Sequence, residues 1–221
     1  LTKLMRLNLL LIFTFYSLSC LGQTQSEFMN YVDEVHANKI LIVYFSRTNN
    51  TKAVAEMIHE KVGGKLVSLV LETPYPKEYD AVVAQVAKEN EENILPLLKT
   101  KISLKEYEII YVGFPTWGMQ LPPPMKSFLS ENDFEAKTVI PFNTNAGFGI
   151  GSSFETVKKF CPKSHVLKGF STQGGIERDG ILYVMEGEKE TEVRQAVNKW
   201  LESLQIFTSV LHFMNISPMG K

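Results

Sequence analysis

The sequence is poor in cysteine and has no excess of positive charge, and these two shortages exclude whole classes of protein. Its 221 residues include only Cys20 and Cys161, which cannot build a disulfide framework or a four-ligand zinc site. The 23 Lys and Arg residues are nearly matched by 24 Asp and Glu residues, so the charge does not support nucleic-acid binding. With 21% charged and 44% hydrophobic residues, the composition is that of a folded domain.

Long apolar runs are also scarce, and the one at the N-terminus is shorter than the roughly 20 residues of a membrane-spanning helix. Two cations precede apolar residues 9–18, and Gly22 closes a possible cleavage tripeptide, as in secretory signals. We therefore expect residues 1–22 to be a signal peptide, residues 23–38 a linker, and the protein to be exported to the periplasm. A lipid anchor at Cys20 is the alternative to cleavage. If the segment is instead a buried N-terminal helix, the protein is cytoplasmic.

The rest of the chain alternates short apolar runs with helical patterns, which predicts an α/β fold. We expect a doubly wound, five-stranded parallel sheet with helices on both faces. The domain should span residues 39–205, with residues 206–221 as a C-terminal tail. Strands are expected at residues 39–45, 66–71, 108–114, 138–142 and 164–170, the fourth kept short by Pro141, and one long helical pattern covers residues 81–98.

One segment falls outside this alternation. Residues 174–186 carry Gly and Asp-Gly around an apolar run, which indicates a hairpin-like excursion.

Hydroxyl side chains gather directly after the first expected strand. Ser46, Thr48 and Thr51 lie at the start of a helix, where free N–H groups and the helix dipole favour an anion. Capping of the helix by Asn49 or Asn50 is the alternative. The segment lacks the Gly-Lys-Ser/Thr sequence of a Walker loop, and no G-x-G-x-x-G pattern follows the strand.

Two further loops follow the third and fourth expected strands. Trp117, within Pro115-Thr116-Trp117-Gly118, is suited to stacking on a flat ring, although packing on its own loop is the alternative. The segment from Asn143 to Gly149 carries glycines that allow the backbone to approach a ligand closely; a flexible linker is the alternative. In an open parallel sheet all three loops meet at one edge, so together they predict a single ligand site.

At these three loops the chain resembles the flavodoxin family, which binds FMN on a five-stranded parallel sheet of order 2-1-3-4-5. The segment Ser46-Arg47-Thr48-Asn49-Asn50-Thr51 stands where the family has roughly (Ser/Thr)-x-Thr-Gly-x-Thr. Asn49 replaces the usual Gly, and because Asn tolerates positive φ, we expect the loop to keep its shape. The resemblance extends from about residue 39 to residue 204.

The resemblance implies FMN as the cofactor and assigns roles to the three loops. Trp117 would stack on the isoalloxazine and Phe148 would form a second aromatic wall. No catalytic residue and no metal ligand is expected, and Cys161 is interpreted as a small core residue. The phosphate would be held by Ser46, Thr48, Asn49, Asn50 and Thr51. The flavin ring would be contacted by Pro115, Thr116, Trp117, Gly118, Asn143, Thr144, Asn145, Gly147, Phe148 and Gly149.

The resemblance leaves three functions open. The first is an electron carrier between redox partner proteins, which we favour because the sequence has no second nucleotide-binding motif. The second is an FMN-dependent NAD(P)H:quinone-type reductase, and the third is a flavin-free binding module. Neither residues 115–124 nor residues 143–153 contain an acidic side chain, so we expect a less negative flavin reduction potential than in acidic relatives.

Overall fold

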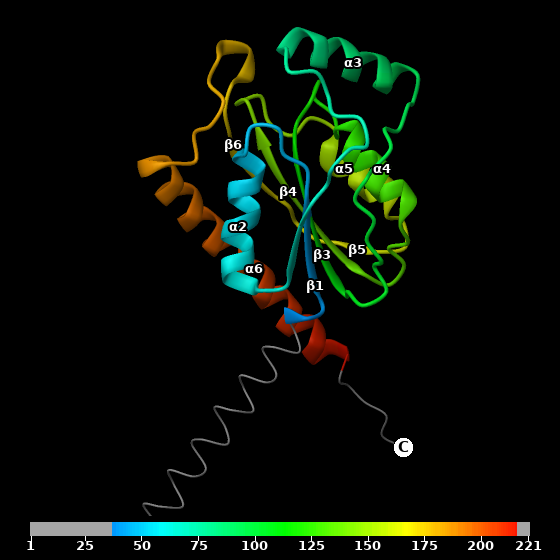
Figure 1. Cartoon of the computed structure of the whole chain (residues 1–221). Helices are drawn as coiled ribbons and strands as arrows, with labels where there is room; N and C mark the ends of the chain where they lie inside the picture. Colours follow the sequence, from blue (N-terminus) through cyan, green and yellow to red (C-terminus); the bar gives the residue numbers. More distant parts are fainter. Residues whose placement is uncertain (1–36, 216–221) are drawn as a thin grey trace, which may run out of the picture. The chain divides into compact units, whose positions relative to one another are not determined.

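A parallel sheet forms the centre of this computed structural model, which describes residues 37–215, with side chains described through Leu204 (Figure 1). The strands run in the order β2-β1-β3-β4-β5, and β6 also pairs with β4. Every pairing is parallel, which confirms the predicted sheet and its 2-1-3-4-5 order. The strand bounds are β1 Ile40–Tyr44, β2 Lys65–Ser68, β3 Ile109–Pro115, β4 Thr138–Asn145, β5 His165–Val166 and β6 Phe170–Gln173.

The edge of the sheet beside β4 is interrupted, which corrects two expectations. The single strand expected at residues 164–170 is divided into β5 and β6, both paired with β4. Leu167 N donates to Val139 O (2.9 Å), so Val139 and, two residues on, Pro141 direct their backbone polar groups toward this edge. The N–H that Pro141 lacks therefore falls opposite the break between β5 and β6. For this reason proline does not shorten the strand, and β4 continues to Asn145.

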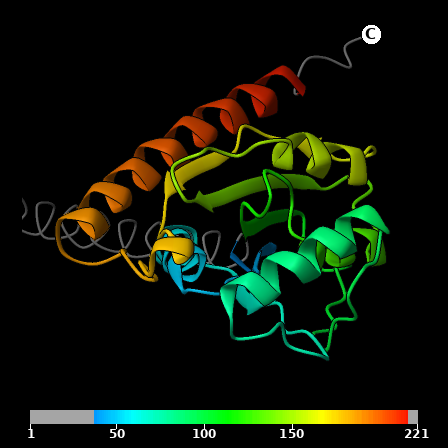
Figure 2. The same cartoon turned by 90° about the horizontal axis from the view of Figure 1, so that it is seen from above.

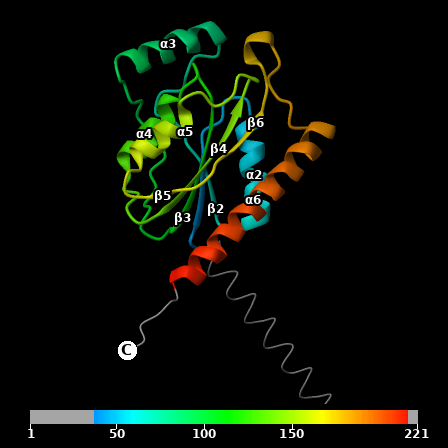
Figure 3. The ribbon, with the colours of Figure 1, turned by 180° about the vertical axis from the view of Figure 1, so that it is seen from behind.

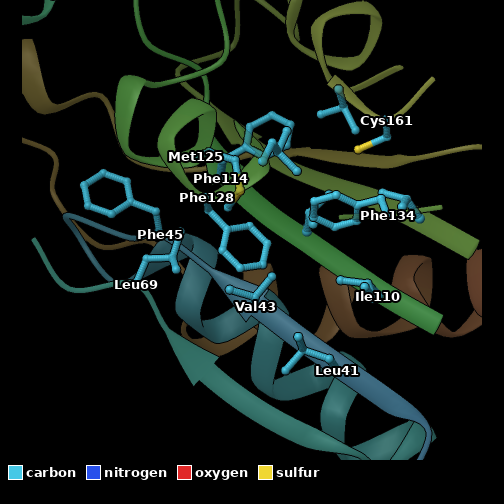
Figure 4. Close-up of a cluster of buried hydrophobic side chains, with 14 of the residues drawn as sticks. Leu41, Val43, Phe45, Leu69, Ile110, Phe114, Met125, Phe128, Phe134 and Cys161 are labelled. Carbon is cyan, nitrogen blue, oxygen red and sulfur yellow. The ribbon is translucent and has the colours of Figure 1, made fainter. Parts of the chain in front are cut away.

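Helices cover both faces of the sheet, and the alternation of side chains along β1 separates two apolar clusters. Leu41 and Val43 face α4 and α5, in the cluster shown in Figure 4, while Ile42 faces α2 and α6. Figures 1 and 3 show these two pairs of helices on opposite sides of the sheet. Their bounds are α2 Asn50–Val62, α4 Pro123–Glu131, α5 Ser153–Phe160 and α6 Gly187–Asn215.

Cys161 lies within the first of these clusters, 2% exposed, and burial raises the pKa of its thiol to about 12. This confirms its interpretation as a small core residue.

Helix α3 (Tyr79–Glu91) is placed differently from the other four. It lies beyond the end of the sheet from which the loops leave, and seen from above it is on the opposite side of the sheet from α6 (Figures 1 and 2). It is shorter than the helix expected at residues 81–98, because Asn93 adopts φ 55° and Pro96 disfavours helix in the residue before it. The chain instead forms an antiparallel bridge between Leu71 and Leu98.

Several expectations concern residues that the structure does not describe. The signal peptide of residues 1–22, with Cys20, and the linker up to residue 36 lie outside the described residues, as do residues 216–221. Helix α6 continues past the expected domain end at residue 205. Within residues 37–215, no helix combines the length and the apolar character needed to cross a membrane.

Candidate functional site

The loops that follow β1, β3 and β4 open into one cavity of about 810 Å³. Trp117 and the hydroxyl groups before α2 therefore lie on the same side of the molecule. Four of the predicted binding residues, Ser46, Asn49, Asn143 and Gly147, are not among the described residues that line it. The eleven that do are Thr48, Asn50, Thr51, Pro115, Thr116, Trp117, Gly118, Thr144, Asn145, Phe148 and Gly149.

The loop before α2 has the conformation expected for an anion site. Asn49 adopts φ 64° and ψ −3°, which confirms that Asn holds the left-handed position where Gly is usual. Ala53 N donates to Asn49 O (2.9 Å), so this is the first helical hydrogen bond and the N–H groups of residues 50–52 have no partner within the helix. The positive end of the α2 dipole therefore forms one wall of the cavity.

The Ser46 hydroxyl belongs to the loop between β1 and α2, and the described residues offer it no partner. Its oxygen is shielded from solvent and makes no hydrogen bond. An unsatisfied buried hydroxyl costs about 1–3 kcal/mol, which a ligand oxygen would recover. The neighbouring hydroxyls differ, because Thr51 Oγ1 bonds Thr144 Oγ1 (2.8 Å) and Thr48 Oγ1 accepts from Asn50 Nδ2 (2.8 Å). A phosphate group fits this set of donors, which are the N–H groups of residues 50–52 and the hydroxyl groups of Ser46 and Thr48.

Asn50 fastens a distant segment to the phosphate-side loop. Its Nδ2 also donates to Leu182 O (2.6 Å), and its Oδ1 accepts from Val184 N (3.1 Å). Those partners belong to the excursion at residues 174–186, which is hairpin-like as predicted, with an antiparallel bridge between Ile176 and Ile181. Asn50 therefore does not cap α2 with its side chain. It holds the hairpin over the cavity.

Arg47 joins the same hairpin to the segment before α3. Its Nε donates to Glu177 Oε1 (2.6 Å), and its Nη1 and Nη2 donate to Pro76 O (2.8 Å) and Lys77 O (2.5 Å). Both charged side chains are about one-fifth exposed and line the cavity. Sequence reasoning missed this pair, because Arg47 occupies a variable position of the loop pattern. Glu177 also brings an acidic side chain to the cavity, whereas the expected flavin reduction potential was based on two loops without acidic residues. The ion pair with Arg47 balances this negative charge.

Trp117 is held in a fixed orientation at the cavity wall. The loop closes a tight turn, since Trp117 N donates to Gln120 O (3.2 Å) and Gln120 N donates to Trp117 O (3.0 Å). Gly118 and Met119 between them have φ of 54° and 59°, as a type I′ turn requires. The indole packs edge-on against Phe45 and Tyr75, with ring centroids 5.3 and 5.2 Å away. It both packs on the protein and faces the cavity.

Two asparagines of β4 order the end of that strand and the loop that follows it. Asn143 is fully buried and donates to Phe114 O (3.1 Å) and Thr116 Oγ1 (2.9 Å), which ties β4 to the Trp117 loop. Asn145 Oδ1 accepts from the N–H groups of Gly147 (2.9 Å) and Gly149 (3.0 Å). These two amides, which we expected to face a flavin, are therefore already bonded within the loop.

The remaining wall of the cavity is α3, which sequence reasoning did not assign to the site. The α3 residues that line the cavity recur at helical spacing. This amphipathic pattern is the feature of the sequence that could have indicated an exposed apolar face on the helix. Glu89 of the same helix does not line the cavity; it is buried and accepts hydrogen bonds from Tyr75 Oη and Gln85 Nε2. Burial and the bond to Glu89 raise the pKa of Tyr75 well above its usual 10.0. The lining residues that were missed are Arg47, Tyr79, Val82, Val83, Val86, Ala87, Asn90, Glu91, Met119, Gln120, Ala146 and residues 174–178.

Known proteins are similar to this chain over the same region. A family model described as flavodoxin matches residues 39–187. A flavodoxin of Nostoc sp. is 25% identical over 148 residues, which are 65% of this chain and 73% of that protein. A proposed flavoprotein from Bacteroides uniformis has a TM-score of 0.60 at 28% identity, covering 73% of this chain and 99% of its own. A flavoprotein from Lactobacillus acidophilus, solved in complex with FMN, has a TM-score of 0.54 at 22% identity, covering 66% and 99%.

Proposed function

Since the chain belongs to the flavodoxin family, we propose that it binds FMN in this cavity and carries electrons between redox partner proteins. When bound, FMN supplies reversible electron transfer, and the protein supplies binding and orientation. The observation that carries the proposal is the solvent-shielded, unpartnered Ser46 hydroxyl in the loop that leads into α2, whose first N–H groups have no partner within the helix. The FMN complex of the Lactobacillus acidophilus protein, which has the same fold, supports the choice of flavin.

The phosphate would lie at the start of α2. Ser46 Oγ and Thr48 Oγ1 would donate to its oxygens, together with the N–H groups of residues 50–52. A dianion is favoured there by the helix dipole even though no lysine takes part. Thr51 would act indirectly, because its hydroxyl already bonds Thr144 and so fixes the end of β4 to α2.

The isoalloxazine would lie between the Trp117 loop and the loop after β4. Two edge-on aromatic contacts fix the Trp117 indole, so its orientation is set before the ligand arrives. Phe148 is 68% exposed at the rim and would cover the outer side of the ring. Asn143 would act as a positioning residue, holding the two loops at their spacing.

The proposal is tested by titrating the apoprotein with FMN and with riboflavin, which share the ring and differ by the phosphate. Flavin fluorescence quenching should show FMN binding at least tenfold more tightly, since charge-assisted hydrogen bonds contribute about 1.5–3 kcal/mol. Ser46→Ala should weaken the binding of FMN more than that of riboflavin, so the ratio of the two dissociation constants should move closer to one. Ser153→Ala is the matched control, because Ser153 also has a buried, unpartnered hydroxyl but lies at the start of α5 and not in the loop before α2. Equal affinity for both flavins, or no binding, contradicts the proposal.

We also propose that residues 1–22 direct export, with cleavage after Gly22. The support is the sequence pattern of two cations, an apolar run and small residues. Mass spectrometry of the mature protein from the producing cell should find residue 23 at the N-terminus. An acylated Cys20 would replace cleavage by the lipid-anchored alternative, and an intact N-terminus would contradict export.

A further inference from the structure

The chain contains two tryptophans, and each of them packs edge-on against a tyrosine. The ring centroids of Trp117 and Tyr75 are 5.2 Å apart. Those of Trp200 and Tyr111 are 6.1 Å apart. The first pair belongs to the apolar cluster on the α4 and α5 face of the sheet, and the second to the cluster on the α2 and α6 face. Indole and phenol rings can each lose one electron, so both pairs place two oxidisable side chains in contact.

The two tyrosines differ in what can accept the hydroxyl proton. Tyr75 Oη donates to Glu89 Oε2, and Glu89 is a carboxylate only 6% exposed, which also accepts from Gln85 Nε2 (2.8 Å). No carboxylate of the described residues accepts from Tyr111, and burial alone raises the pKa of its phenol to about 12. A phenol that loses an electron becomes a strong acid, and its proton leaves only to a base within hydrogen-bond reach. Tyr75 has such a base and Tyr111 does not.

The pair that has this base also stands beside the cavity. Trp117 lines the cavity that we assign to FMN, whereas Trp200 does not. Tyr75 and Glu89 do not line it, so an oxidant in the cavity reaches them through the Trp117 ring. The other ring in contact with Trp117 is Phe45, which is much harder to oxidise than a phenol. From the cavity inward, the order of electron donors is therefore Trp117 and then Tyr75, with Glu89 as the proton acceptor.

We propose that Trp117, Tyr75 and Glu89 form a light-driven, proton-coupled electron donor to FMN bound in this cavity. The oxidant is oxidised FMN in its excited state, which takes one electron from Trp117. Tyr75 then gives one electron to Trp117, and the Tyr75 hydroxyl proton moves to Glu89. In total the flavin gains one electron, Tyr75 loses one electron and one proton, and Glu89 gains that proton. Return of both to Tyr75 restores the starting state.

This inference rests on the proposed FMN function and adds a photochemical activity to it. Because the proton has moved to Glu89, return of the electron must wait for the proton. The charge separation should therefore last longer than one that stops at Trp117.

The test is transient absorption of the FMN-loaded protein after a laser flash. In wild type a tryptophan radical should appear first and be replaced by a tyrosyl radical, more slowly in deuterated water. Tyr75→Phe should abolish the tyrosyl signal, leave the tryptophan radical and shorten its lifetime. Glu89→Gln should also abolish it, because an amide oxygen can accept the hydrogen bond but cannot take the proton. Tyr111→Phe is the matched control and should behave as wild type.

The same donor chain can be tested without FMN. Azide radicals made by pulse radiolysis oxidise tryptophan in the apoprotein by one electron. Part of the tryptophan radical should convert to a tyrosyl radical within the same molecule, at a rate that does not depend on protein concentration. Tyr75→Phe should remove this conversion, and Tyr111→Phe should leave it unchanged.

The possible results separate this inference from the FMN proposal. Protein that binds FMN but forms no tyrosyl radical overturns the inference alone, as does a tyrosyl signal that survives in Tyr75→Phe. Protein that binds no FMN, yet shows the conversion with azide radicals, overturns the proposed function and the light-driven step with it. Should Glu89→Gln fail to fold, Glu89→Asp keeps a carboxylate with a shorter reach and should slow tyrosyl formation. An unaltered rate in that variant overturns the role of Glu89.

Discussion

The two ends of the cavity are built in different ways. The phosphate end joins three segments that are far apart in sequence, through the side chains of Arg47 and Asn50. The other end is one face of α3, held to the body by two buried valines and the Glu89–Tyr75 hydrogen bond. A change at the phosphate end should therefore alter ligand binding and local stability together. A change at an exposed residue of the α3 face should leave the stability of the phosphate end unaltered.

The largest effect is expected from Arg47→Gln. The substitution removes an ion pair and two hydrogen bonds to carbonyl groups, and leaves Glu177 unpaired beside the proposed phosphate. We expect a loss of about 3 kcal/mol in FMN binding, or roughly a hundredfold in the dissociation constant, by fluorescence titration. Arg178→Gln is the control, because Arg178 lines the same cavity but pairs only with exposed Asp179. Similar losses in the two variants would show that general positive charge, not the Arg47 clamp, is responsible.

Asn50→Ala should have the next largest effect, and it should be local. Three hydrogen bonds are lost, and two of them join the hairpin at residues 174–186. Each has a net contribution of about 1 kcal/mol, so the hairpin should lose about 2 kcal/mol of protection. Amide hydrogen exchange followed by mass spectrometry should show faster exchange at residues 181–184. Exchange in α3 should not change. If amide exchange became equally faster at residues 181–184 and in α3, the two ends of the cavity would not be independent, which would contradict our description.

These two residues mark the limit of what the sequence predicts. Buried parallel strands appear as continuous apolar runs, so the sheet and the three loops could be predicted from the residues. The strand order was implied only by the resemblance to the flavodoxin family. The Arg47–Glu177 pair joins residues 130 positions apart, and no local pattern encodes it. The amphipathic pattern of α3 predicts one apolar face but not that Val83 of that face turns to a cavity. The divided edge strand depends on pairing with β4, which is a tertiary property.

The α3 end should be the more sensitive to alkali. Because the pKa of Tyr75 is raised in the folded protein, its stabilising contribution is complete below pH 10 and is lost progressively as the pH rises above it. Urea unfolding at several pH values should show a steeper decline above pH 10 in wild type than in Tyr75→Phe. The difference in slope should be smaller than the roughly 1.4 kcal/mol per pH unit of a fully shielded group, because Tyr75 is half-buried. Parallel curves would contradict a structural role for this phenol.

The smallest effect is expected at Asn49. Its φ of 64° is strained for a residue with a Cβ, so Asn49→Gly should stabilise the loop by up to about 1 kcal/mol and tighten FMN binding a few-fold. Asn49→Ala should act in the opposite direction by a similar amount, since Ala tolerates the left-handed region less well than Asn. Both are measured by the same flavin titration. If both variants weaken binding, the Asn49 side chain itself contacts the ligand.

A crystal structure of the protein with FMN tests the division of the cavity most directly. We predict the phosphate at the start of α2 within hydrogen-bond distance of Ser46 Oγ, and the flavin ring against Trp117. A flavin ring lying along α3, with the Trp117 face uncovered and the Ser46 hydroxyl still unpartnered, would contradict the account.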